Sequence, residues 1–198
     1  MGLLKTSLRR KNNLETRIVI GGFGGQGILF LGRILAYAGM LENKEVTWFP
    51  SYGAEVRGGT ANCTVILSDE LIGSPVVANP DILIVMNEAS LIKFLPRLKQ
   101  NGLFLFDSSL IKGPRLRTDI ENVSVPATEI SNTISNTKSA NMVLLGAFIA
   151  KTGILNDASV FEALENSRPD GKKRGINGNK KAISEGRQYI ENKKSKDS

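Results

Sequence analysis

Apolar residues along this chain follow two patterns, short β-branched runs and longer segments with helical spacing. The longer segments predict helices over residues 28–41, 89–99, 140–151, 156–164 and 178–193. The short runs predict strands over residues 18–20, 45–49 (ended by Pro50), 61–68, 81–86, 103–106 and 123–125. Runs 81–86 and 103–106 are apolar almost without interruption, which is typical of strands buried on both faces.

Strands and helices therefore alternate along most of the chain, and this order predicts an α/β fold. We expect a Rossmann-like, three-layer architecture in which helices cover both faces of a mostly parallel sheet. Region 61–72 is typical of a hairpin and predicts an antiparallel edge to that sheet. A chain of 198 residues is long enough to bury one core of this kind.

The net charge of +7 is unevenly distributed. Basic residues are concentrated in residues 1–17 and 168–198, whereas the middle of the chain is mildly acidic. These ends carry no interleaved aromatic residues and no nucleic-acid motif, so we expect solvated tails or an acidic partner, and no nucleic acid. No apolar run has the length of a membrane span, and residues 1–16 lack the apolar core of a signal peptide. We expect a cytoplasmic protein that contacts no membrane.

Side chains that commonly perform catalysis are scarce. Histidine is absent, which excludes Ser-His and Cys-His nucleophilic pairs. Cys63 is the only cysteine, so this chain alone cannot form an internal disulfide, hold an iron–sulfur cluster or build a zinc site. Cys63 lies in an apolar run, and we expect a buried, inert thiol. We predict no catalytic residue and no metal ligand in this chain.

A glycine-rich segment follows the first predicted strand directly. Gly22, Gly24 and Gly27 have the G-x-G-x-x-G spacing, and a helix-periodic segment begins at once. One interpretation is an anion site at the helix N-terminus, and the other is a tight turn that serves packing alone. A nicotinamide site further requires an acidic residue at the end of the second strand, or an arginine for a 2′-phosphate. Residues 46–51 contain neither, which argues against NAD and NADP.

A second glycine-rich segment, Ser51-Tyr-Gly-Ala-Glu-Val-Arg-Gly-Gly-Thr60, follows the second predicted strand. It is therefore expected at the same carboxyl edge of the sheet, where open α/β sheets bind ligands. Arg57 offers a fork of donors suited to carboxylate or phosphate, and Glu55 is a candidate to orient it. The alternative is a surface loop with a weak ion pair.

Together these segments resemble the γ subunit of the 2-oxoacid:ferredoxin oxidoreductases. The resemblance covers residues 17–190 and leaves a basic N-terminal extension (1–16) and a Lys-rich tail (191–198) outside. It rests on the two glycine-rich segments and on Ser68-Asp-Glu, Ser74-Pro75, Pro80-Asp81, Pro126-Ala-Thr-Glu129, Ala140-Asn-Met-Val-Leu-Leu-Gly146, Asn179, Ala182 and Gly186.

The resemblance implies a subunit that is not active alone. Complexes of this family convert a 2-oxoacid, coenzyme A and oxidised ferredoxin into an acyl-CoA, carbon dioxide and reduced ferredoxin. Thiamine diphosphate, Mg²⁺ and 4Fe–4S clusters are then expected on partners, namely α and β subunits that bind thiamine and a ferredoxin-like δ subunit. The second segment is closest to the 2-oxoglutarate and branched-chain members, and 2-oxoglutarate is the predicted substrate.

We hypothesise that the carboxyl edge receives coenzyme A and contacts the partner subunits. The residues assigned to the coenzyme A mouth are Gly22, Gly24, Gly25, Gln26, Gly27, Arg57 and Thr60, and those assigned to subunit contact are Ser51, Tyr52, Glu55, Arg57, Gly58 and Gly59. Two alternatives stay open. One is a stand-alone nucleotide-binding or regulatory module, and the other is the β subunit of an indolepyruvate ferredoxin oxidoreductase.

Overall fold

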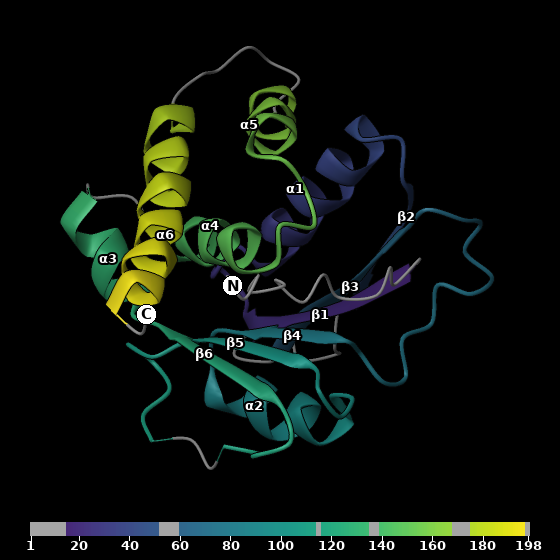
Figure 1. The fold of residues 1–198 in the computed structure, drawn as a ribbon, viewed down its shortest axis with the longest axis horizontal. Helices are drawn as coiled ribbons and strands as arrows, with labels where there is room; N and C mark the ends of the chain where they lie inside the picture. The colour runs from purple at the N-terminus through teal and green to yellow at the C-terminus, as the bar shows by residue number, and fades with distance from the viewer. Residues whose placement is uncertain (1–14, 52–59, 114–115, 135–138, 168–174, 197–198) are drawn as a thin grey trace, which may run out of the picture.

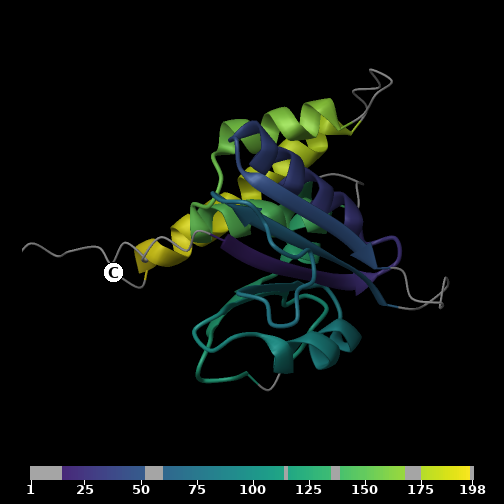
Figure 2. The ribbon, with the colours of Figure 1, turned by 90° about the vertical axis from the view of Figure 1, so that its right-hand side faces the viewer.

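The computed structural model describes residues 15–51, 60–113, 116–134, 139–167 and 175–196. One sheet forms the middle of three layers, with α1, α3, α4, α5 and α6 on one side and α2 on the other (Figures 1 and 2). The strands are β1 (Glu15–Phe23), β2 (Glu45–Ser51), β3 (Thr60–Ser68), β4 (Ile82–Val85), β5 (Leu103–Asp107) and β6 (Glu121–Val125). The helices are α1 (Ile28–Leu41), α2 (Glu88–Phe94), the 3-10 turn η1 (Leu95–Arg97), α3 (Ala127–Ile134), α4 (Ala140–Thr152), α5 (Asp157–Asn166) and α6 (Ile176–Lys196).

The six strands lie in the order β2-β3-β1-β4-β5-β6. β1, β4, β5 and β6 pair in parallel, while β3 runs antiparallel to both of its neighbours, β1 and β2. The α/β, three-layer, mostly parallel fold is therefore confirmed. The predicted antiparallel pairing is present, but β3 forms it with β1 and β2 and lies one strand in from the edge. The predicted hairpin within 61–72 is wrong, because β3 ends at Ser68 and residues 71–72 belong to no strand.

Alternate residues of β1 supply two separate cores. Ile18 and Ile20 face α1 and α4, whereas Val19 faces α2. β4 and β5 are buried along their whole length, as their continuous apolar runs predict. None of the helices that the structure describes is both long and apolar enough to cross a membrane.

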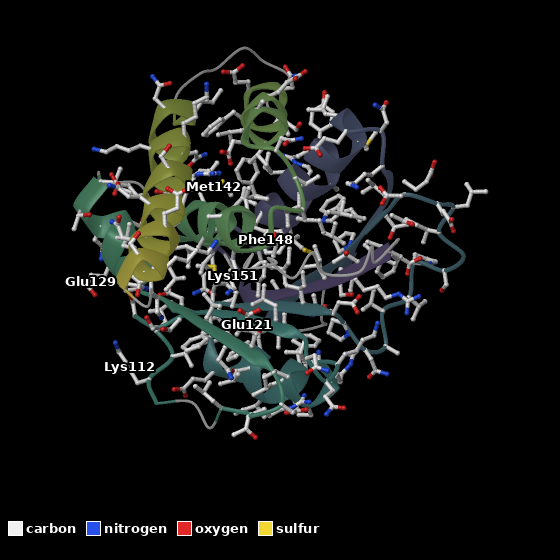
Figure 3. All side chains as sticks on the ribbon, viewed as in Figure 1. Lys112, Glu121, Glu129, Met142, Phe148 and Lys151 are labelled. Atoms are coloured by element: carbon white, nitrogen blue, oxygen red, sulfur yellow. The ribbon has the colours of Figure 1, made fainter. Side chains whose placement is uncertain are left out.

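Helix α4 lies against α6 with almost no space between the backbones. A Cβ atom on Gly146 would lie 1.9 Å from the Ile183 carbonyl oxygen, and one on Gly186 would lie 1.9 Å from the Val143 carbonyl oxygen. Met142 and Phe148, both labelled in Figure 3, are buried on α4. The two glycines therefore face each other's helix and set the distance between them.

The last turn of α4 is also attached to the sheet. Lys151 forms an ion pair with Glu121, the first residue of β6, and the two lie close together in Figure 3. The helix is thus held near its N-terminal half by α6 and at its end by an edge strand.

The predicted elements are all present, but several differ in their bounds and one helix was not predicted. β2 continues through Pro50. An edge strand tolerates proline because N–H groups on the outer side of such a strand have no partner in the sheet. The predicted helix 89–99 is divided, since α2 ends at Phe94 and the chain tightens into η1 at Pro96. Helix α3 was not predicted, because its sequence ATEISNTI is polar and rich in residues of low helix propensity.

Cys63 is fully buried, as expected, and burial raises the pKa of its thiol to about 12 despite a hydrogen bond from Trp48. We expect no reaction with a disulfide reagent at pH 8 in the folded protein and complete reaction in denaturant. Because the pKa of this thiol is higher in the folded than in the unfolded protein, the free energy of unfolding is expected to fall as pH rises above about 9. In Cys63→Ala, the part of this fall that comes from the thiol should be absent. Labelling of the folded protein at the rate seen in denaturant would contradict this prediction.

Candidate functional site

The carboxyl edge of the sheet begins with a glycine turn between β1 and α1. β1 runs further than predicted, so Gly22 lies within the strand and pairs with Ala61, and the turn itself comprises residues 24–27. A Cβ atom on Gly22 would lie 2.6 Å from Cδ1 of Ile28. Gly22 therefore permits close packing of the first residue of α1 on β1. A Cβ atom on Gly24, by contrast, would meet open space.

The side chain of Gln26 braces this turn. Its Oε1 accepts a hydrogen bond from the Phe23 N–H at 2.6 Å, and its Nε2 donates to the Met86 carbonyl at 3.2 Å. Met86 directly follows β4, so the amide connects the turn to the neighbouring parallel strand. Both ends of the amide contact backbone, which indicates that Gln26 holds the turn in shape.

Gly27 is fixed by its conformation and by a neighbour from α4. It has φ of 75°, in the left-handed region, and a Cβ atom there would lie 2.3 Å from Nδ2 of Asn141. That same Nδ2 donates to the Gly27 carbonyl oxygen at 3.0 Å. Asn141 thus attaches the first turn of α4 to the first turn of α1.

The N-termini of α1 and α4 consequently meet at this edge. Neither N-cap residue, Gly27 or Ser139, makes a side-chain capping hydrogen bond, and neither first turn contains an acidic residue. The other side of the edge differs, because Asn87 caps α2 through a 2.7 Å bond from the Ser90 N–H. Two helix N-termini that meet at one place favour an anion through their dipoles.

Asp107, at the end of β5, caps α3 from outside the helix. Its buried carboxylate accepts hydrogen bonds from the Thr128 hydroxyl at 2.6 Å, the Thr128 N–H at 3.2 Å and the Ser109 N–H at 3.0 Å. Ser109 in turn accepts from the Glu129 N–H at 3.1 Å. This network satisfies the first turn of α3, so Asp107 has a structural role at the edge.

The second glycine-rich segment starts and ends at the same edge, as its position in the sequence predicts. Ser51 ends β2 opposite Asn62, and Thr60 begins β3 opposite Phe23. Tyr52, Glu55, Arg57, Gly58 and Gly59 lie outside the described residues. Their assignment to coenzyme A or to subunit contact stays a prediction.

Two residues of this edge were not assigned from the sequence, Asn141 and Asp107. Each is a polar residue beside an apolar element, Asn141 at the start of an apolar helix and Asp107 at the end of a buried strand. That placement is the sequence signal that indicates a capping or bridging role. Within the described residues, no three His, Cys, Asp or Glu side chains are grouped so as to hold a metal ion.

Comparison with known proteins identifies relatives of this chain. Ketoisovalerate oxidoreductase subunit VorA of Methanothermobacter thermautotrophicus is 40% identical over 155 residues, which cover 76% of this chain and 31% of VorA. The chain thus spans about a third of the length of that relative. 2-Oxoglutarate synthase subunit KorC of Methanocaldococcus jannaschii is 36% identical over 166 residues, covering 82% of this chain and 89% of KorC.

Solved structures share the fold. The keto/oxoacid ferredoxin oxidoreductase γ subunit of Geobacter sulfurreducens superposes with a TM-score of 0.76 at 27% identity, covering 88% of this chain and 98% of that one. A 2-oxoglutarate:ferredoxin oxidoreductase of Magnetococcus marinus, solved with 2-oxoglutarate, coenzyme A and succinyl-CoA, gives a TM-score of 0.81 at 21% identity, covering 89% of this chain and 31% of that one.

The sequence profile of one family spans nearly all of the described chain. It matches residues 17–189, which include both glycine-rich segments and every strand and helix from β1 to α6 up to its last turns. The chain belongs to the pyruvate ferredoxin/flavodoxin oxidoreductase family.

Proposed function

We propose that this chain is the γ subunit of a 2-oxoacid:ferredoxin oxidoreductase that acts on 2-oxoglutarate. The complex would contain α and β subunits that bind thiamine diphosphate with Mg²⁺, and a ferredoxin-like δ subunit with 4Fe–4S clusters. Family membership and the near full-length match to KorC support this proposal. The 40% identity to VorA favours ketoisovalerate as a second candidate substrate.

The proposed task of this chain is to bind and orient coenzyme A. The observation that carries this proposal is the convergence of the α1 and α4 N-termini, neither capped by its N-cap side chain, at Gly27. Their N–H groups and dipoles suit a phosphate, and the open space at Gly24 leaves room for it. Thiamine and the clusters supply decarboxylation and electron transfer when bound, and the single cysteine of this chain fits their location on partners.

Coenzyme A dependence of the purified complex tests the proposal. Complexes that carry Gly24→Val or Arg57→Ala are expected to show at least a tenfold higher KM for coenzyme A, with little change in the KM for the 2-oxoacid. The valine fills the space above the turn, and the alanine removes the cation that the sequence assigns to the coenzyme A mouth. Gly73→Val, at another glycine whose Cβ meets open space, is the matched control.

The outcomes separate the parts of the proposal. An unchanged coenzyme A dependence in both variants would overturn the assignment of the edge to coenzyme A. A panel of 2-oxoacids, assayed with a low-potential acceptor, distinguishes 2-oxoglutarate from ketoisovalerate. A wild-type chain that co-purifies with no thiamine-binding subunit would contradict the γ-subunit assignment itself.

A further inference from the structure

A second surface lies away from the glycine turn, beside the free edge of the sheet. It is a cavity of about 420 Å³ between the later turns of α1, strand β2 and the end of α5. We call it the β2 groove, and Figure 1 shows these three elements together at one side of the molecule. Its main side chains are Arg33, Tyr37, Met40, Val46 and Trp48, with Asn166 and Ser167 at one end.

β2 is the outermost strand on this side, and one of its backbone edges has no partner strand among the residues described. Trp48, on the face toward α1, is 36% exposed, and Phe49, on the opposite face, is 57% exposed. Met40 of α1 is 60% exposed across the groove. Proteins usually protect a long edge strand with lysines, prolines, bulges or a covering element, and in β2 Pro50 is the only residue of this kind, because no charged residue follows Glu45.

The β2 groove contains one positively charged side chain, Arg33, which bears on the kind of segment that can bind there. The Arg33 guanidinium lies 5.5 Å from the centre of the Phe30 ring and donates to the Ser167 carbonyl at a long 3.4 Å. No ion pair to Arg33 occurs within the described parts of the chain. Glu165, two residues before Ser167 at the end of the groove, pairs with Lys180. Among the described residues, Arg33 therefore has no carboxylate partner.

We propose that the β2 groove docks an extended segment of a partner subunit. The segment adds a strand to β2, places an apolar side chain between Trp48 and Met40, and places an acidic side chain on Arg33. Strand addition explains why an edge that carries two exposed aromatic residues is left open, and the Arg33 guanidinium, which has no carboxylate partner among the described residues, complements an acidic residue in the partner. This inference rests on the proposed function only in taking the partner from the same complex.

The groove and the glycine turn lie at different places along α1. Arg33 and Met40 are in its middle and last turns, whereas Gly27 caps its first. A partner segment in the groove would therefore leave the anion-binding edge open to solvent. The two sites can be disrupted separately, and this permits a sharp test.

The test uses the whole complex, purified through a tag on this chain. Met40→Asp and Arg33→Glu are each expected to reduce the retained partner subunits at least tenfold, because one puts a charge among apolar side chains and the other repels the acidic residue. Both side chains are exposed, so folding should be preserved. Ile92→Asp, on α2 at the other face of the sheet and 76% exposed, is the matched control and should retain its partners.

Hydrogen exchange of the wild-type protein provides a second measurement. Amides of β2 that face away from β3 are expected to exchange at least tenfold more slowly in the complex than in the isolated chain. Unchanged exchange, or full retention of partners by both variants, would overturn the proposal. A homodimer of the isolated chain that Met40→Asp abolishes, with assembly of the complex intact, would overturn it in favour of a second copy. A wild-type complex that oxidises no 2-oxoacid contradicts the proposed function and leaves the β2 groove result standing.

Discussion

Gly146→Val is expected to lower the free energy of unfolding by about 3 kcal/mol or more. The smallest side chain at this position would already place its Cβ atom 1.9 Å from the Ile183 carbonyl oxygen. The obstacle is backbone, so no rotamer change can relieve it, and α4 and α6 must separate. Because α4 is buried over most of its length, that separation would open gaps in the main core.

Denaturant titration of the isolated chain measures this effect, and a fall in melting temperature of about 10 °C is the thermal equivalent. Gly186→Ala should be destabilising for the same reason, since its Cβ would meet the Val143 carbonyl oxygen at 1.9 Å. The double variant, with both substitutions, should lose less stability than the sum of the losses of the two single variants, because one separation of the helices relieves both contacts. Gly73→Ala, in open space, is the control and should be close to neutral. A stable Gly146→Val protein would show that the two helices do not touch as described.

Asp107→Ala is expected to lower the free energy of unfolding by about 3 kcal/mol. The substitution removes a buried carboxylate and leaves the N–H groups of Ser109 and Thr128 without their acceptor. Helix α3 depends on this carboxylate more than on its own sequence, which has few strong helix formers. The change should therefore loosen α3 before the rest of the domain.

Hydrogen exchange resolves where the effect of Asp107→Ala occurs, and chemical denaturation gives its size. Amides of α3 should exchange faster in the variant, whereas those of β4 should respond only to the global loss of stability. Asp69→Ala is the control, because that carboxylate is exposed and pairs with Lys44 at the surface, where such a pair contributes about 0–1 kcal/mol. Equal stability of the two variants would contradict a capping role for Asp107.

The sequence predicted those elements whose pattern is set by burial. Helix 28–41 was predicted with the bounds that α1 has, because its apolar spacing and the glycines before it both indicate a helix that begins at residue 28. α3 was not predicted because the Asp107 carboxylate of β5 stabilises it, and that contact joins residues distant in the chain. The extension of β1 through Gly22 was not predicted because glycine disfavours strands locally. In the fold, the close packing of Ile28 on Gly22 outweighs that preference.

The candidate site was predicted in the same uneven way. The position of the glycine turn at the helix N-terminus followed from spacing, and so did the common edge of the two glycine-rich segments. The roles of Gln26 and Asn141 did not, since each bonds to backbone atoms of another element that only the fold brings near. Polar residues that organise a turn and polar residues that bind its ligand look alike in a sequence.

The reversal of β3 has a consequence for how this scaffold can vary. A parallel neighbour of β1 would need a crossover helix, and the chain would leave the ligand edge to reach the far end of the sheet. Here the chain leaves the edge at Ser51 and re-enters the sheet beside it at Thr60, and both ends are held in register by ladder partners. Insertions or deletions between these two anchors would change only the connection, while every strand keeps its pairing. Related chains can thus share one framework and differ in a single replaceable connection.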